Sequence, residues 1–389
     1  MKFVYLLLPL ILISCGKEVS VTHPIKEHLP SQASITTTVT VGSKNAEKVK
    51  PTNLSFTFSY NDSLRFFDYP KAIDHHDGLF YLLEKRKNYI SVFDTSGHFQ
   101  YQISRAGNGP GELIAPVTFE FSDDYSELYI LDTYDTEIFQ KVDDRFVPKK
   151  SVYHGLLRAY DLCVLGNSYF ISGYGISKQE LKALQNQDIT EQELSVSGPI
   201  NKYDMTTDSL ISSFGFKYKS YFGSKTYGGM LSEVILSCNS SSKTVMAQHT
   251  YFPYLFGYNK NNELMWVTEL KNYLAVNVLE EKGNKGYILS MYSNPTIYQR
   301  FLGFNPSSNE KNFIQFQKYI PQSAFSKKVY SENEINKIKN QTIGGILIDN
   351  KTGRSTYFET DHRLVLMKDG FNVWYNKYKK YNPYEVEKK

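Results

Sequence analysis

Short alternating runs of apolar and polar residues fill most of the chain from residue 55 onward. Runs such as FTFSY, LFYLLE, YISVFD, VTFEF and ELYILD are rich in aromatic and β-branched residues, and turn-forming Gly, Asn, Asp or Ser residues bound them. A period of two places alternate side chains on opposite faces of a strand. The pattern therefore predicts an all-β chain.

Two kinds of polar turn recur along these strands. The first joins an outgoing and an incoming strand at HHDG (75–78), SDDYSE (122–127), LGNS (165–168), NSSSK (239–243), EKGNKG (281–286) and MKDG (367–370). The second follows further along each unit, at FDTSGHF (93–99), VDDRF (142–146), YDMTTDSL (203–210), YNKNNELMW (258–266) and IDNKTGRSTYF (348–358). Turn positions 77, 124 and 167 are 47 and 43 residues apart. Four strands repeated at this interval are typical of a β-propeller blade.

The turns predict a six-bladed β-propeller with four-stranded blades over residues 51–384. The last unit has a hairpin at 363–375, and its missing hairpin is found at 55–70, so we expect N- and C-terminal hairpins to close the ring in one blade. Two long gaps between turns predict insertions near 176–198 and 293–343. An eight-stranded barrel with a second domain is the alternative, and it leaves the matched turns unexplained.

The chain begins MKFVYLLLPLILISCGKE, with one cation followed by an apolar run too short to span a bilayer as a helix. The run ends in Leu-Ile-Ser before Cys15, which is the pattern of a bacterial lipoprotein signal. We expect residues 1–14 to be a signal peptide and Cys15 to carry lipid. Gly16-Lys17-Glu18 has no aspartate at its second position, which favours an outer-membrane lipoprotein, periplasmic or surface-exposed. An ordinary secretory signal is the alternative.

Residues 19–51 hold no aromatic residue and are rich in Thr, Ser, Lys and Pro, so residues 15–50 are predicted to be a flexible tether. The formal net charge of +4 argues against nucleic acid as a partner. Cys163 and Cys238 follow the signal. They can pair in an oxidising periplasm or remain two buried thiols, and we favour the free thiols.

The stretch YQISRAGNGPGELIAP (101–116) raises the question of a phosphate-binding loop. Such a loop needs G-x-x-x-x-G-K-[ST] or G-x-G-x-x-G opening a helix, whereas the glycines here precede Glu112 and the strand PVTFEF. We therefore predict a structural corner between two blades, with Arg105 and Glu112 able to pair across it. The residues of this corner are Gly107, Gly109, Pro110 and Gly111.

A resemblance to a known family follows from the same region. Residues 90–113 read IxVFDxSGxFxxxIxxxGNGPGEL, which resembles the repeat of the six-bladed β-propeller lipoproteins of Bacteroidota, relatives of NHL and TolB-type propellers. The resemblance is strongest over residues 79–150. It implies a secreted, lipid-anchored propeller and no shared catalytic residues.

Motifs for catalysis or metal binding are absent from the sequence: there is no H-E-x-x-H, paired C-x-x-C, G-x-S-x-G or EF-hand loop. His75 and His76 are neighbours in a strand and point to opposite faces, so we interpret them as part of a solvated turn. The acids of DTYDTE (132–137) lack the alternating spacing of a calcium site. We expect no metal and no cofactor.

Loops on one face of the propeller provide the candidate binding residues. In a propeller, the connections between blades share a face with the loops between second and third strands, and both insertions fall there. The candidates are Arg105, Glu112, His154, Arg158, Tyr160, Asp161, Tyr218, Tyr221, Phe222, Tyr227, His249, Tyr251, Phe252 and His362, with Tyr254, Asp361 and Arg363 beside them. Tyrosine rings suit sugars, peptides and protein partners, although single tyrosines often pack between blades.

These loops predict a binding module for a glycan, a peptide or an envelope partner protein, held to the membrane by its N-terminal lipid. The alternative is a propeller hydrolase or lyase whose active site at the channel mouth uses His154, Asp161, His249 or His362. Such a site requires ionisable groups from different blades to converge. We favour binding over catalysis.

Overall fold

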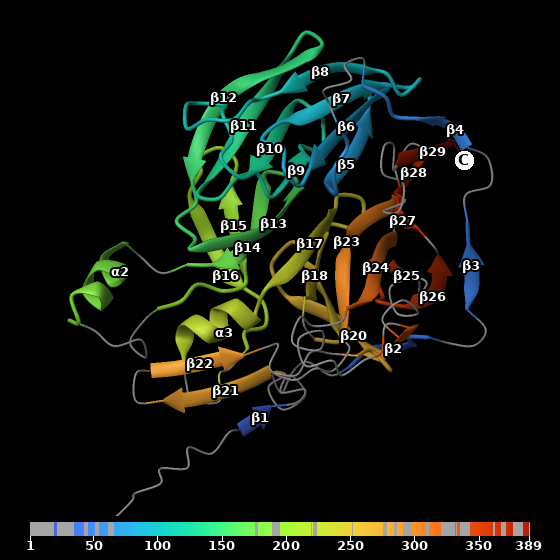
Figure 1. Ribbon diagram of the computed structural model, residues 1–389. Helices are drawn as coiled ribbons and strands as arrows, with labels where there is room; N and C mark the ends of the chain where they lie inside the picture. The colour runs from blue at the N-terminus through green and yellow to red at the C-terminus, as the bar shows by residue number, and fades with distance from the viewer. Residues whose placement is uncertain are drawn as a thin grey trace, which may run out of the picture.

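The computed structural model describes residues 19–21, 35–42, 46–50, 54–60, 66–175, 178–188, 195–218, 220, 224–250, 252–274, 278–283, 286–290, 298–308, 311–319, 331, 333–334, 343–360, 362–366, 371–375 and 384–388. Six sheets stand around a central axis (Figure 1). The predicted six-bladed β-propeller is confirmed. The predicted signal peptide and Cys15 lie outside the described residues.

The first three blades each take four consecutive strands, and the first strand of each is innermost. Blade 1 is β5 (Pro70–His76), β6 (Leu79–Glu84), β7 (Ile90–Asp94) and β8 (Phe99–Ile103). Blade 2 is β9 (Thr118–Phe121), β10 (Glu127–Leu131), β11 (Asp135–Val142) and β12 (Arg145–Tyr153). Blade 3 is β13 (Arg158–Leu165), β14 (Ser168–Tyr174), β15 (Ile200–Asp204) and β16 (Leu210–Phe214).

Blades 4 and 5 gain a fifth strand from the N-terminal part of the chain. Blade 4 is β17 (Val234–Asn239), β18 (Thr244–His249), β19 (Tyr254–Asn259) and β20 (Leu264–Lys271), with β2 (Thr37–Thr40) added parallel to β20. Blade 5 is β23 (Tyr298–Ser308), β24 (Lys311–Tyr319), β25 (Ile343–Asp349) and β26 (Ser355–Thr360), with β3 (Glu47–Val49) parallel to β26. We call β2 and β3 the strap.

The strap corrects the prediction of a flexible tether over residues 15–50. Its described residues pair with the outer edges of two blades, and Val39 and Val41 are buried in the core that blades 4 and 5 share. The stretch TTTVTVG lacks aromatic residues, but its β-branched Thr and Val residues favour an extended strand. Composition alone therefore gave the wrong prediction there.

Blade 6 closes the ring with strands from both ends of the chain, as predicted. The C-terminal part supplies β27 (Arg363–Leu366), β28 (Phe371–Tyr375) and β29 (Tyr384–Lys388), and β4 (Leu54–Thr57) pairs antiparallel with β29. The division is three strands and one, rather than two hairpins. Beyond β4 the chain crosses to blade 1, where the Ser59 N–H donates to the carbonyl of Gly97 at 2.7 Å.

The structure places the predicted second insertion differently from the sequence. EKGNKG (281–286) joins β21 (Val278–Gly283) to β22 (Gly286–Ser290), and β21 pairs with β1 (Val19–Val21) in a separate three-stranded sheet. The first hairpin of blade 5 is instead β23–β24, inside 293–343. A hairpin has the same local sequence pattern in a blade and in an insertion. Only its pairing with strands distant in sequence distinguishes the two.

The two ends of the strands define two faces of the ring. The corner face carries the connections between blades, the loops between second and third strands, the helices α2 (Lys178–Gln185) and α3 (Lys225–Leu231), and the β1–β21–β22 sheet. The turn face, at the opposite ends of the strands, carries the first-to-second and third-to-fourth turns. No helix in the described parts of the chain is long and apolar enough to cross a membrane.

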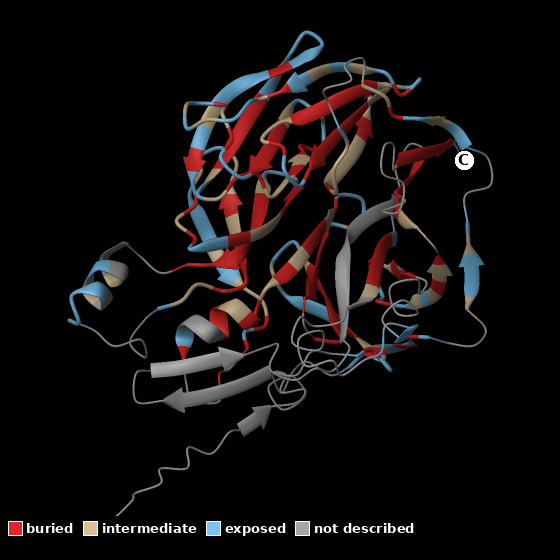
Figure 2. Ribbon diagram, viewed as in Figure 1, coloured by how far each residue is buried: buried red, intermediate tan, exposed pale blue. Residues whose placement is uncertain are grey.

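The hydrophobic core lies between adjacent blades. Figure 2 shows buried residues along the second strands β6, β10 and β14, and exposed residues along the outermost strand β12 of blade 2. The rings of Tyr129 in blade 2 and Tyr169 in blade 3, both fully buried, lie 5.5 Å apart. Each blade therefore covers the apolar face of its neighbour, and this packing keeps the loops of both faces in place.

Candidate functional site

The glycine-rich stretch between β8 and β9 is a corner in which a carboxylate closes the loop. The Arg105 guanidinium and the Glu112 carboxylate pair at 2.7 Å, and the other oxygen of Glu112 accepts the Gly109 N–H at 2.9 Å. The Gly109 N–H, together with Arg105, lowers the pKa of Glu112. A Cβ atom on Gly107 would lie 2.0 Å from this carboxylate. Close packing thus accounts for both the glycine and the acid of the motif.

The acids of DTYDTE hold the same corner from blade 2. Asp132 accepts the N–H groups of Ile114 at 2.6 Å and Ala115 at 2.7 Å, and Glu137 accepts the Gly111 N–H at 3.0 Å. Gly111 has φ +75°, and a Cβ there would lie 2.3 Å from the Pro148 side chain. The backbone donors that a phosphate would require are therefore bound to the protein's own carboxylates.

The candidate histidines do not converge. His154 lies between Val152 and Leu156, which belong to the core of blades 2 and 3, and its Nδ1 accepts the Leu156 N–H at 3.2 Å. His249 is buried in the core of blades 3 and 4, with the Phe216 and Phe256 rings each 5.6 Å away. Burial lowers the pKa of His154 and takes that of His249 to about 3. Both imidazoles are therefore neutral packing groups.

His362 lies in the connection from blade 5 to blade 6, with its ring 6.1 Å from the Trp374 ring, whereas His154 follows blade 2 and His249 belongs to blade 4. Across the described parts of the chain, no group of three or more His, Cys, Asp or Glu side chains is arranged to hold a metal ion. The structure thus brings together none of the histidines on which the enzyme alternative depends.

Several predicted surface aromatics are core residues, which corrects their assignment as binding residues. Tyr218, Phe252 and Tyr254 are buried between blades 3 and 4, where the Tyr218 and Phe252 rings stack at 5.7 Å. Aromatic residues in a loop are exposed only when other side chains already fill the space between the blades below it. Here the loop aromatics themselves fill that space. Tyr221, Phe222, Tyr251 and Asp361 lie outside the described residues, as does the side chain of Tyr227 in α3.

Asp161 connects blades 3 and 4 and does not face a ligand. Its carboxylate accepts the Leu236 N–H at 2.8 Å and the Leu162 N–H at 3.0 Å, and burial raises its pKa to about 7. Arg158 is exposed, with its guanidinium carbon 5.2 Å from the centroid of the Tyr160 ring. Arg105, Arg158 and Tyr160 thus remain candidate contacts on the corner face.

A pocket of about 210 Å³ opens on the turn face, at the end of the channel opposite the predicted loops. The inner strands β5, β9, β13 and β17, with the turns that follow β9 and β17, supply its walls, so four consecutive blades contribute. Three carboxylates, those of Asp74, Glu120 and Asp123, line it together with the hydroxyls of Ser240 and Ser241. We call this the turn-face pocket.

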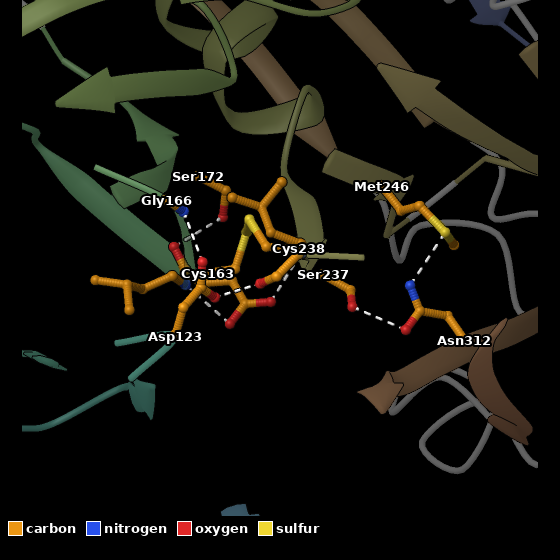
Figure 3. The surroundings of a disulfide bond; sticks show 12 residues. Asp123, Cys163, Gly166, Ser172, Ser237, Cys238, Met246 and Asn312 are labelled. Carbon is orange, nitrogen blue, oxygen red and sulfur yellow. Dashed lines mark hydrogen bonds between the residues drawn. A yellow bond between two sulfur atoms is a disulfide. The ribbon is translucent and has the colours of Figure 1, made fainter. Parts of the chain in front are cut away.

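A disulfide between Cys163 and Cys238 forms part of the pocket wall, which corrects the prediction of two free thiols. The cysteines lie on the adjacent inner strands β13 and β17 with Cα atoms 5.4 Å apart, and Cys238 lines the pocket (Figure 3). They are separated by 75 residues in sequence. The pairing is evident only in the fold, where β13 and β17 are neighbouring inner strands.

Asp123 ties together the turns beside that disulfide. One carboxylate oxygen accepts the Gly166 N–H of blade 3 at 2.9 Å, and the other accepts the hydroxyl of Ser240 in blade 4. Figure 3 shows Asp123 and Gly166 next to the two sulfurs. The wall over blades 2 to 4 is therefore held by one covalent link and two hydrogen bonds.

The adjacent histidines of blade 1 directly follow Asp74, the pocket residue of that blade. They point to different faces of β5, as predicted, but both are packed, which corrects their interpretation as a solvated turn. His75 is buried against Phe80 at 4.3 Å, and the His76 ring stacks on Tyr125, a pocket residue, at 3.7 Å. Asp77 lies 3.0 Å from His76, and a hydrogen bond from Lys141 lowers the pKa of Asp77.

The turn-face pocket is not among the sites predicted from the sequence, although the sequence contains a signal for it. Acidic or hydroxyl-bearing residues occupy the same end of the first strand, or the turn that follows it, in blades 1, 2 and 4: Asp74 in blade 1, Glu120 and Asp123 in blade 2, and NSSS (239–242) in blade 4. A superposition of the blade repeats would have placed them on one face. None of the described residues that line the pocket is a lysine or an arginine, so its field favours cationic groups and hydrogen-bond donors.

Comparisons with known proteins agree with the architecture. A putative exported protein from Bacteroides fragilis NCTC 9343 is similar in structure, with a TM-score of 0.56 at 12% identity over 92% of this chain and 100% of its own. A member of the DUF4221 family from Bacteroides vulgatus ATCC 8482 matches with a TM-score of 0.48 at 10% identity, over 88% of this chain and 98% of its own. No curated protein matches the chain.

A family described as a 6-bladed beta-propeller, DUF5128, matches residues 62–294. The match spans all of blades 1 to 4 apart from the strap, including the disulfide and every wall of the turn-face pocket. Because it extends over more than half of the sequence, the chain belongs to the DUF5128 family of six-bladed β-propellers.

Proposed function

We propose that this protein is a lipid-anchored cell-envelope propeller and that its turn-face pocket binds a basic side chain displayed by a peptide or partner protein. The observation that carries the proposal is the set of carboxylates from Asp74, Glu120 and Asp123 around one cavity, with no lysine or arginine among the described residues of its wall. Carboxylates at the mouth of a low-dielectric channel attract and orient cations.

The size of the cavity favours a single group over a whole ligand. Pockets that enclose a drug-sized molecule measure roughly 300–1,000 Å³, and this one measures about 210 Å³. A lysine or arginine side chain of a larger partner fits such a volume, and Phe121 and Tyr125 supply apolar surface for its methylene groups. An amino sugar of a glycan is the competing occupant.

Export and anchoring are proposed on two features that are independent of each other. The first is the lipoprotein signal pattern that ends at Cys15. The second is the Cys163–Cys238 disulfide, because disulfides persist in the periplasm and outside the cell but rarely in a bacterial cytosol. Placement in the outer membrane and kinship with NHL and TolB-type propellers remain predictions of the sequence.

The enzyme alternative has less support. It relies on His154, Asp161, His249 or His362. The first three are engaged in packing or in hydrogen bonds to the backbone, and the His362 ring lies beside that of Trp374 in the connection to blade 6. A carboxylate-lined pocket alone assigns no reaction. The one hydroxyl–carboxylate pair described among its lining residues, Ser240 with Asp123, ties two turns together, because Asp123 also accepts the Gly166 N–H. Binding is therefore the function that the geometry supports best.

Peptide and glycan arrays probed with the full chain carrying Cys15→Ala test the proposal. Lysine- and arginine-containing peptides should be retained in preference to matched glutamine peptides, and retention should fall between about 0.05 and 0.5 M salt because ions screen charge attraction. Binding of neutral glycans that is insensitive to salt, with no preference for basic peptides, would contradict the proposed ligand.

A further inference from the structure

We infer that the corner face around blade 2 lies against the membrane that carries the lipid anchor, so that the turn-face pocket points away from the bilayer. The inference rests on the lipidation of Cys15 proposed above. It concerns a surface that the pocket does not include, and its partner is a lipid surface.

The path of the N-terminal segment provides the first support. β1 pairs antiparallel with β21, with Val19 opposite Glu280, and β21 belongs to the connection between β20 and β23 on the corner face. Figure 1 shows β1 next to β21, outside the ring. Cys15 precedes Val19 by four residues, and four extended residues reach at most about 14 Å. The lipid must therefore enter the bilayer close to this face.

Exposed apolar side chains on the same face provide the second support. Ile114, Tyr134, Tyr153 and Leu157 are 46%, 53%, 52% and 40% exposed. They come from adjoining loops, because the carbonyl of Tyr134 accepts the N–H of His154, which lies between Tyr153 and Leu157. Ile114 lies against the same loop, since its N–H donates to the Asp132 carboxylate at 2.6 Å. We call these four residues the corner patch.

Arginines flank the corner patch and indicate what covers it. Arg105, whose side chain is 77% exposed, precedes it in the blade 1–2 corner, and Arg158 directly follows Leu157. Tyrosines with arginines beside aliphatic residues suit the interface of a bilayer, where rings sit at the headgroups and guanidinium groups contact phosphates. This composition, together with the entry point of the lipid, favours a membrane over a protein partner.

The strand β12 provides an internal ruler for this orientation. It runs from Arg145, beside the third-to-fourth turn on the turn face, to Tyr153 in the corner patch. Nine strand residues span roughly 30 Å. With the corner patch on the lipid, a probe at residue 153 lies at the headgroups while a probe at residue 144 is far from them.

Bimane fluorescence in vesicles tests the orientation with a matched pair of labels. The full lipidated chain carrying Tyr153→Cys or Asp144→Cys is labelled without reductant, so that Cys163 and Cys238 stay paired and only the introduced thiol reacts. Each protein is placed in vesicles of phosphatidylcholine and phosphatidylglycerol with brominated acyl chains. We expect fluorescence at position 153 to fall at least about twofold relative to unbrominated vesicles, because a group at the membrane interface lies next to the brominated acyl chains, and no change at position 144.

Flotation of the same samples separates the two possible failures. If both labelled proteins float with the vesicles and are quenched equally, more strongly at 144, or at neither position, the orientation is overturned and the anchor stands. The Cys15→Ala variant, which cannot carry the lipid, should not float. If the chain with Cys15 also fails to float, the anchor and the orientation are both contradicted. The arrays with basic peptides remain an independent test of the pocket in either case.

Discussion

The side-chain hydroxyl of Tyr384 donates a 2.7 Å hydrogen bond to the backbone carbonyl of Asp68. Tyr384 begins the strand β29 of blade 6, and Asp68 precedes β5 of blade 1, so the bond joins the last blade to the first. The ring of Tyr384 is fully buried and lies 5.7 Å from the ring of Phe58, which follows β4. Segments from the two ends of the chain therefore meet at this side chain.

Tyr384→Phe should weaken the closure of the ring. The change keeps the buried ring but leaves the Asp68 carbonyl without this donor, which should lower the free energy of unfolding by about 1–3 kcal/mol. Guanidinium-induced unfolding monitored by tryptophan fluorescence measures the change. Tyr134→Phe, at an exposed tyrosine, is the control and should shift stability by less than about 0.5 kcal/mol. Equal effects of the two changes would show that the bond does not fasten the ring.

Removal of the strap should destabilise the propeller. A chain that starts at residue 51 loses the burial of Val39 and Val41 and the strands that cover β20 and β26, which should lower the free energy of unfolding by about 2–4 kcal/mol. A chain that starts at residue 35 keeps the strap and is the control. Calorimetry should give a lower melting temperature for the shorter chain only. Identical melting would mean that the strap does not contribute to stability.

Loss of the disulfide should cost several kcal/mol. The Cys163–Cys238 link spans 75 residues, and the entropy of closing such a loop corresponds to about 4 kcal/mol in the unfolded-chain treatment, with measured values commonly near 2–4 kcal/mol. The double variant Cys163→Ala, Cys238→Ala should unfold at lower denaturant. A reductant should bring the natural chain to the same midpoint and leave the double variant unchanged; a reductant without effect on the natural chain would refute the link.

The buried carboxyl of Asp161 predicts a pH dependence of stability. Its folded-state pKa of about 7 is above the unfolded value of 3.8, so the folded protein binds the extra proton between these limits. The stability from this group is complete below pH 4 and is lost as the pH rises through 7. Asp161→Asn cannot ionise, so its unfolding free energy should fall less between pH 5 and pH 8 than that of the natural chain. An unchanged slope would contradict the role of Asp161.

Local patterns predicted the blades well because a four-stranded unit carries its turn residues within itself. The turns at 77–78, 122–127 and 165–168 fall between the first two strands of blades 1 to 3, as the sequence indicates. The Arg105–Glu112 pair was also predictable, since both residues flank one short loop. The exchange of β21–β22 with β23–β24 shows the limit of this approach, because blade membership depends on contacts between distant segments.

The candidate site was harder to predict for the same reason. Phe252 and His249 belong to loops rich in aromatic residues, yet they fill the gap between two blades that the sequence does not place side by side. The turn-face pocket takes its residues from four blades, mostly from blades 2 and 4, and no single stretch of sequence reveals it. Alignment of the blades with one another recovers Asp74 and Glu120 at one end of their strands, whereas the disulfide required the positions of β13 and β17.

The affinity of the pocket for a basic peptide tests the central claim most directly. Calorimetric titration with a lysine peptide selected on the arrays should give a Kd at least about tenfold higher for the double variant Asp74→Asn, Glu120→Gln than for the natural chain, a loss of roughly 1.4 kcal/mol. The double variant Asp143→Asn, Asp144→Asn removes the same charge from an exposed turn of blade 2 and should stay within about twofold. Equal Kd values for the two double variants, with both proteins folded, would contradict binding at the turn-face pocket.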